Sequence, residues 1–347
     1  MPETLITQAI VVKTRKLSEN DRFLSCLTPS YGRLDVVAKG VRKANSKLAG
    51  ACAGLAELKI QLALNPSHPA LRQYETLQPF FNLRSHFLIL NAAVLLAETA
   101  EKLLPAPPEQ HSGWHRHPES EKDPTARIYY TLANSLMILD ALALACTPIQ
   151  DSPKALARPL NTLMASALMQ MLKAAGHGLQ LRHCIYCENE TLSAQIEPSA
   201  HQRPDFTTQP WWYFSWSAHG VLCHSCHALY RGQGFGAQAL PNLIKVSGST
   251  LWFAQSLNPA LTQPQFNLDQ LVQAPAHASH SPQQDSLPEK DTLFTACQRI
   301  YSLPWPAAAD PDVAAQKALK FTLAWLGQAL PKAPKSLAGF LNATPQP

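Results

Sequence analysis

The sequence is poor in charge and has no membrane-length apolar run. Charged residues make up 15% of its 347 residues, against about 25% in an average soluble domain. No apolar stretch reaches the roughly 18 to 20 residues that span a bilayer. The two best candidates, residues 88–97 and 136–146, contain Asn91 and Asp140. Both are therefore predicted to be core helices, and the length allows two or three domains.

Targeting and nucleotide-hydrolysis signals are also missing. Met1 is not followed by a basic segment and an apolar stretch of the secretory kind, so we expect a cytoplasmic protein with reduced cysteines. No G-x-x-x-x-G-K-[ST] phosphate loop occurs. The glycine-rich residues 232–236 are predicted to form a turn. We expect no enzymatic activity.

The most specific feature that is present is a pair of CxxC motifs. Two sulfurs separated by two residues can reach the same ion at about 2.3 Å, and four thiolates complete a tetrahedral zinc shell without water. A shell closed by four protein ligands is typical of a structural zinc site, because a catalytic zinc keeps one position open for water or substrate. We therefore predict a structural Zn²⁺ held by Cys184, Cys187, Cys223 and Cys226.

Three alternatives to a zinc site with four thiolate ligands remain open. The four cysteines could be unligated thiols, they could pair as disulfides, or one adjacent histidine could replace a cysteine as a zinc ligand. These histidines are His183, His224 and His227. With four thiolates available, we expect them to lie outside the coordination shell or to face solvent. The 188–222 spacer is longer than that of a compact zinc ribbon, so we expect part of it to loop out.

The net charge of +5 is modest, but part of it is concentrated. Residues 36–56 contain no acidic side chain, and Lys39, Arg42, Lys43 and Lys47 all fall within them. Gly40, Asn45 and Ser46 favour an exposed, mobile loop. We predict that its cations contact the phosphates of a nucleic acid. The alternative is a solvated surface turn. Further residues that would extend the same face are Arg15, Lys16 and Arg33.

The first eighty residues predict a small barrel. Apolar or alternating segments occur at 6–13, 22–27, 34–38, 58–64 and 71–77. Five short strands of this kind suggest an N-terminal OB-fold β-barrel, a fold that commonly binds single strands. Tyr31 and Tyr74 are available for base stacking, although such tyrosines more often pack in the core or rim.

The remaining chain reads as an α-helical domain that carries the four-cysteine zinc element. Apolar residues recur at helical spacing over 83–104, 128–139 and 156–171, and Gly176 predicts a helix stop. Further helices are predicted at 240–257, 293–303 and 313–330. The aromatic run 211–216 is predicted to pack a hairpin, with base stacking as the alternative.

We accordingly predict a multidomain α+β protein with four parts. Residues 1–80 form the OB-fold DNA-binding domain, and 81–182 form the first part of the helical domain. Residues 183–230 form the zinc-binding hairpin, and 231–347 complete the helical domain, with a linker at 274–291. A proline-rich loop is predicted at 105–123.

The order of these parts resembles the RecO family of bacterial recombination mediators. The resemblance rests on Tyr31-Gly32-Arg33-Leu34, on Leu323-Ala324-Trp325-Leu326-Gly327 and on the CxxC pairs. It also includes residues 9–12, 38–42, 46–48, 77–80, 83–84 and 335–336. It spans nearly the whole chain.

The resemblance implies a DNA repair protein of the cytoplasm and nucleoid. Such proteins bind single- and double-stranded DNA and anneal complementary strands, including strands coated by single-stranded DNA-binding protein. They work with RecR, and in many bacteria RecF, to load RecA. The acidic, apolar C-terminal tail of the coating protein is a further expected partner. The competing hypothesis is a zinc-stabilised protein-interaction scaffold that does not bind DNA directly.

Overall fold

The computed structural model describes most of the chain. The described residues are 4–52, 54–65, 68–104, 123–145, 153–190, 211–232, 243–255, 259–264 and 310–344. The chain divides into two compact units. The first comprises residues 1–151, 259–297 and 334–347, and the second comprises 152–258 and 298–333. The predicted linker 274–291, the helix at 293–303 and all but Asp123 of the loop 105–123 lie outside the described residues.

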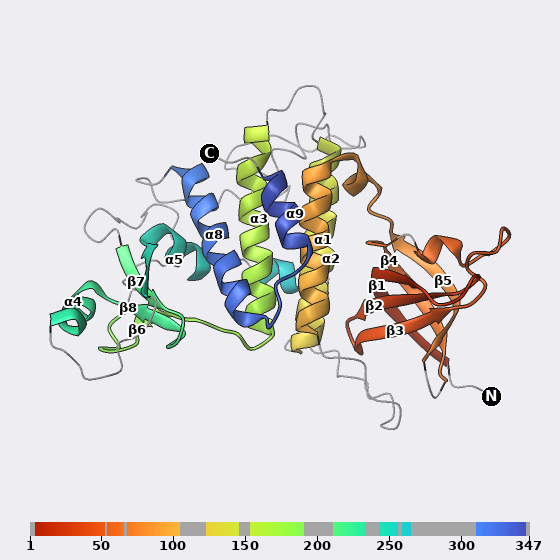
Figure 1. The fold of residues 1–347 in the computed structure, drawn as a ribbon, viewed down its shortest axis with the longest axis horizontal. Coiled ribbons are helices and arrows are strands. Elements are labelled where there is room, and N and C mark those ends of the chain that lie inside the picture. Colours follow the sequence, from red (N-terminus) through yellow and green to blue (C-terminus); the bar gives the residue numbers. More distant parts are fainter. Residues whose placement is uncertain are drawn as a thin grey trace, which may run out of the picture. The chain divides into compact units, whose positions relative to one another are not determined.

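The first unit begins with a mixed five-stranded sheet (Figure 1). Its strands are β1 (Thr4–Lys16), β2 (Arg22–Thr28), β3 (Gly32–Ala38), β4 (Glu57–Ala63) and β5 (Ala70–Gln78). The strand order is β1-β2-β3-β5-β4, and the sheet is closed because the first and last strands of this order, β1 and β4, also pair with each other. The shortest pairing in the sheet is the parallel one between β3 and β5, which joins Val37 and Ala70. All five predicted strands are confirmed.

Alternating side chains explain why these segments form a closed sheet. Along β3, Leu34, Val36 and Ala38 are fully buried, while the residues between them are half-buried. The buried set joins Leu58 and Ile60 of β4 in one core. Since successive strand residues point to opposite faces, one face of the sheet lines this core and the other faces outward.

The same unit contains six described helices: η1 (Ala49–Cys52), η2 (Phe81–Ser85), α1 (Phe87–Leu103), α2 (Pro124–Ala145), η3 (Pro259–Thr262) and α9 (Ser336–Ala343). The sheet is contacted by η1, α1 and α2, while α9 packs on α1 and η3 packs on α2. The Tyr129 hydroxyl of α2 donates to Glu57 Oε1 of β4 at 2.9 Å. Ser25 of β2 donates to Glu101 of α1 at 3.3 Å. These hydrogen bonds fix the sheet to the helices.

The second unit combines two long helices with a smaller sheet (Figure 1). Its elements are α3 (Pro153–Ala174), β6 (Gln180–Cys184), β7 (Trp211–Ser215), β8 (Gly220–Leu222), α4 (His224–Gly232), β9 (Leu243–Ser247), α5 (Gly248–Gln255) and α8 (Pro311–Ala329). The strand order is β6-β8-β7-β9, and α3 packs along α8. Gly176 ends α3 with a φ of 88°, a left-handed conformation that favours glycine.

One helix prediction is partly wrong. Residues 243–247 form strand β9, which pairs antiparallel with β7, and among the described residues of this segment the helix covers 248–255. The segment Leu243-Ile244-Lys245-Val246 is rich in β-branched and apolar residues. Its short apolar run is compatible with either structure, and pairing with β7 decides in favour of the strand.

The aromatic run on β7 packs, as predicted. Trp212 and Phe214 are buried, and the rings of Phe214 and Phe321 of α8 meet edge-on at 5.3 Å. Trp216 stacks on Phe321 at 5.6 Å. These rings attach the small sheet to α8.

Within the described residues, no helix combines the length and apolarity needed to cross a membrane.

Candidate metal centre and nucleic-acid interface

The four cysteines of the CxxC pairs come together in the second unit. Cys184 ends β6, and Cys187 lies in the turn that follows it. Cys223 lies between β8 and α4, and Cys226 lies in the first turn of α4. Because β6 and β8 pair in parallel, their ends deliver both motifs to one edge of the sheet. We call this arrangement the four-cysteine module.

The spacing of the sulfurs fits a tetrahedral ion. The four Sγ atoms lie within 4.8 Å of one another, and those of Cys187 and Cys223 are 3.9 Å apart. Metal–sulfur bonds of about 2.3 Å in a tetrahedron place sulfurs about 3.8 Å apart. All six cysteines among the described residues are free thiols, so the structure does not contain the alternative disulfides. The module is compatible with a structural zinc site.

Backbone N–H groups also point at the sulfurs. Cys223 N–H donates to Cys184 Sγ, and Cys226 N–H donates to Cys223 Sγ, both at 3.4 Å. Burial alone would raise the pKa of Cys184, but the N–H donors of Cys187, Cys223 and Tyr186 outweigh it and lower that pKa to about 7. The module is therefore preorganised for at least one thiolate.

In the second CxxC pair the pKa values of the thiols are raised instead of lowered. Burial raises the pKa of both Cys223 and Cys226, and crowding by neighbouring sulfurs contributes at Cys226. Four thiolates in one small volume repel one another unless a cation lies among them. A coordinated ion removes this penalty because a metal-bound thiol is deprotonated.

The histidines beside the module have distinct environments. His227 is buried and its ring stacks on Tyr213 of β7, with centroids 3.3 Å apart and an interplanar angle of 9°. His224 is exposed, with its ring 6.3 Å from Tyr213. His183 Nε2 lies 4.0 Å from Glu190 Oε1. The Tyr213–His227 stack joins two elements and was not evident from the sequence, which predicts only that the histidines lie outside the coordination shell or face solvent.

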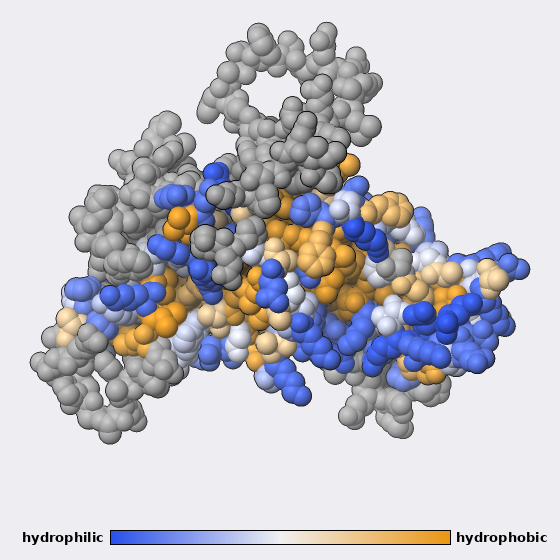
Figure 2. Space-filling model, turned by 45° about the horizontal axis from the view of Figure 1, so that its top comes forward, coloured by the Kyte–Doolittle hydropathy of each residue, from blue (hydrophilic) through white to orange (hydrophobic). Residues whose placement is uncertain are grey.

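The predicted DNA-contacting cations lie on the connection between β3 and η1. All four are exposed: Lys39, Arg42, Lys43 and Lys47. Hydrophilic side chains gather over the N-terminal sheet that carries this connection, at the right of Figure 2. Their role in contacting DNA remains a prediction.

The base of this basic connection is anchored. Gly40, with a φ of 63°, donates its N–H to Asp21 Oδ1 at 2.7 Å, and Arg42 N–H donates to the Asn20 carbonyl at 3.1 Å. The Gly40 N–H is the main cause of a lowered pKa at Asp21. Val41 is buried in the sheet core. Sequence reasoning missed these anchors, because Asp21 is nineteen residues from Gly40.

The two arginines predicted to extend the basic face lie on strands. Arg15 of β1 forms an ion pair with Asp35 of β3, at 3.5 Å, so part of its charge is compensated. Arg33 of β3 is half-buried, and its buried Nε has no hydrogen-bond partner within the described structure. Lys16, at the end of β1, is exposed. Their contact with DNA also stays a prediction.

The fold and the module together define a two-unit protein with a candidate structural metal centre. The first unit has a closed five-stranded sheet with packed helices, and the second carries a four-cysteine module compatible with structural zinc. Residues 1–80 match the family model described as "Recombination protein O N terminal".

Relatives that align over about two thirds of the chain agree with this match. "DNA repair protein RecO" of Cutibacterium acnes is 27% identical over 220 residues, which cover 63% of this chain and 72% of the relative. The protein of the same name from Dehalococcoides mccartyi is 28% identical over 233 residues, covering 67% and 73%. These matches confirm the predicted resemblance to the RecO family, at modest identity.

Proposed function

We propose that this chain is a recombination mediator of the cytoplasm and nucleoid. It binds single- and double-stranded DNA, anneals complementary strands coated by single-stranded DNA-binding protein, and helps to load RecA together with RecR, and with RecF in bacteria that use it. The observation that carries the proposal is the match to proteins named "DNA repair protein RecO". The exposed cations on the β3–η1 connection give it a physical basis.

The N-terminal sheet is proposed to act as an OB-fold barrel. Annealing requires that two phosphate backbones be neutralised while the base edges stay free to pair. Lys39, Arg42, Lys43 and Lys47 supply four such charges from one connection. Anchoring by Asp21 and Asn20 holds the start of the connection, while its charged side chains extend into solvent. No catalytic group is needed for this role.

The four-cysteine module is proposed to bind Zn²⁺ through Cys184, Cys187, Cys223 and Cys226. When bound, the ion neutralises the thiolates and links the two motifs, which is a structural function. The chain's own part is to present the sulfurs from β6 and α4 at the spacing described above.

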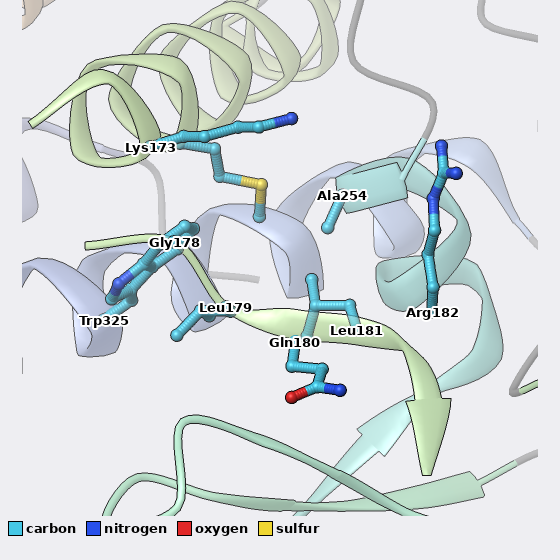
Figure 3. Close-up of a pocket in the computed structure, with 9 residues that line it drawn as sticks. Lys173, Gly178, Leu179, Gln180, Leu181, Arg182, Ala254 and Trp325 are labelled. Carbon is cyan, nitrogen blue, oxygen red and sulfur yellow. The ribbon is translucent and has the colours of Figure 1, made fainter. Parts of the chain in front are cut away.

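A cavity in the second unit is a candidate site for the tail of the coating protein. It measures about 310 Å³ and is lined by apolar side chains, including Met169, Leu181 and Trp325, together with Lys173 and Arg182. Figure 3 shows Lys173 and Arg182 extending on the same side of β6. An acidic, apolar peptide end complements this combination.

DNA binding by the full chain tests the proposal against its main alternative. Fluorescence anisotropy with labelled single- and double-stranded oligonucleotides should give saturable binding at low salt that weakens steadily as salt increases. Absence of binding to both probes, by folded and zinc-loaded protein, would contradict direct DNA recognition.

The alternative is a scaffold that contacts only proteins. Two large side chains favour it: Phe81 is 75% exposed and Phe87 is 73% exposed. Hydrophobic surface is also visible over the helices in Figure 2. A contiguous exposed apolar surface often marks a protein contact. A scaffold would bind partner peptides tightly in the anisotropy assay and leave the oligonucleotides free.

A further inference from the structure

Strand β7 connects the four-cysteine module to a long helix. Its Tyr213 ring stacks on His227, the residue that follows the candidate ligand Cys226. The ring of the next residue, Phe214, packs edge-on against the ring of Phe321 of α8, with the ring centroids 5.3 Å apart. Neighbouring residues of a strand point to opposite faces. The module and α8 therefore pack on the two faces of the same strand.

Strand β6 provides a second connection, from the module to the cavity. The strand ends at Cys184, and the preceding residues Gln180, Leu181 and Arg182 line the cavity. Trp325, which lies one helical turn beyond Phe321 on α8, also lines the cavity. Figure 3 shows β6 and Trp325 around the same space. One wall thus belongs to β6, which carries the first motif, and another belongs to α8, which packs on β7, the strand that contacts the module.

The packing between the two motifs leaves little room for adjustment. A Cβ added at Gly220, the first residue of β8, would collide with Ile185, which lies between the two cysteines of the first motif. Ile185 N–H also donates to the Val221 carbonyl at 2.9 Å. The first motif is therefore seated closely on β8, and a shift of the motif would displace β6.

We propose that Tyr213 and His227 are positioning residues of the four-cysteine module, and that the metal-loaded module sets the shape of the cavity through β6 and β7. Metal binding holds the two motifs together. The energy of that binding stabilises the strands that carry them, because an ion and its surrounding fold are coupled. This inference concerns the second unit alone and does not depend on DNA binding.

Zinc affinity tests the positioning role. Competition with a chromogenic chelator is measured for the full chain, for Tyr213→Ala and for Tyr213→Phe, which keeps the stacking ring. Loss of residues that support metal ligands typically weakens affinity 10- to 100-fold. We expect that loss for Tyr213→Ala and near-native affinity for Tyr213→Phe. Native affinity in Tyr213→Ala would overturn the role.

Two further variants keep this test decisive. Tyr213→Leu retains apolar volume without the aromatic stack, and it replaces the alanine variant if that protein fails to fold. His227→Phe retains a stacking ring but has no ligand nitrogen. We expect it to bind zinc as the unmodified chain does. A zinc affinity lowered tenfold or more in His227→Phe would show that His227 is a ligand and would contradict its positioning role.

The cavity is followed separately by fluorine NMR of 5-fluorotryptophan protein, with the Trp325 signal assigned from Trp325→Phe. Removal of zinc by a chelator should shift or broaden the Trp325 signal, and restored zinc should return it. Far-UV circular dichroism shows whether the helices persist throughout. An unchanged Trp325 signal after complete metal removal would refute the link to the cavity.

Discussion

At the scale of single residues, Glu98 holds the C-terminal helix of the first unit. Its carboxylate on α1 accepts from the backbone N–H groups of Lys335 and Ser336, at 2.8 and 2.9 Å. It also accepts from the Ser336 hydroxyl at 2.8 Å. Ser336 is the first residue of α9, so a side chain from another helix satisfies N–H groups that α9 itself cannot.

The charge of Glu98 gives this contact a defined pH dependence. Burial would raise its pKa, but the three hydrogen bonds outweigh burial and lower the pKa below its ordinary value of 4.5. A lowered pKa means that the stabilisation is present above about pH 4.5 and is lost as the pH falls through the folded-state pKa.

We therefore predict that Glu98→Gln destabilises the docked α9 by about 1 kcal/mol at pH 7. Amide hydrogen exchange over residues 336–343 measures this effect. The difference from the unmodified chain should shrink below the folded-state pKa, because protonated Glu98 then resembles glutamine. An equal difference at pH 7 and under acid conditions would contradict the role of the charge.

The cysteines make a second prediction at this scale. Replacing Cys184 and Cys187 together with serine should release zinc, because only one motif remains to hold it. Metal analysis of the purified protein measures the loss. Cys26→Ser is the matched control, since Cys26 lies in the sheet core of the other unit. Its zinc content should be unchanged. An unmodified chain that contains no zinc would contradict the proposed site.

At the scale of elements, the aromatic contact between β7 and α8 should carry much of the small sheet's stability. Phe214 is fully buried, so Phe214→Ala is expected to lower the free energy of unfolding of the second unit by about 3 to 5 kcal/mol. Urea denaturation measures it. Phe87→Ala is the control, because Phe87 is 73% exposed and its loss should cost about 0.5 kcal/mol or less. Equal effects would contradict the packing role.

The elements also show what the sequence can predict. The five strands of the first sheet and helices α1, α2, α3 and α8 follow from apolar periodicity, which is a local signal. The sheet β6-β8-β7-β9 does not, because its pairings join residues far apart in sequence. Gln180 pairs with Gly220, for example, and Trp211 with Ser247. Such contacts leave little trace in any one segment.

In the candidate site, too, some features could be predicted from the sequence and others could not. The CxxC spacing identified four cysteines that the structure brings within 4.8 Å of one another. Exposure of the cationic residues 39–47 also followed from composition. The Asp21–Gly40 anchor and the Tyr213–His227 stack were not predictable, since each depends on the meeting of two elements. Local patterns indicate ligands and charges, whereas supporting contacts require the fold.

At the scale of the whole molecule, salt dependence tests the proposed DNA surface. Four phosphate contacts to a single strand give a slope of log affinity against log salt of about −3. Replacing Lys39, Arg42, Lys43 and Lys47 with alanine should remove most of that slope. The control makes the same change of charge at four other exposed lysines: Lys102, Lys245, Lys320 and Lys332. Its slope should equal that of the unmodified chain. A slope unchanged by the first set would contradict the assignment.

Annealing of complementary oligonucleotides coated by single-stranded DNA-binding protein tests the central claim most directly. Pairing is followed by fluorescence quenching without ATP, with and without the folded, zinc-loaded chain. The proposed mediator role predicts that the chain accelerates annealing and that the fourfold alanine variant at residues 39–47 does so less. An annealing rate that the unmodified chain leaves unchanged would contradict that role and would favour a scaffold that contacts only proteins.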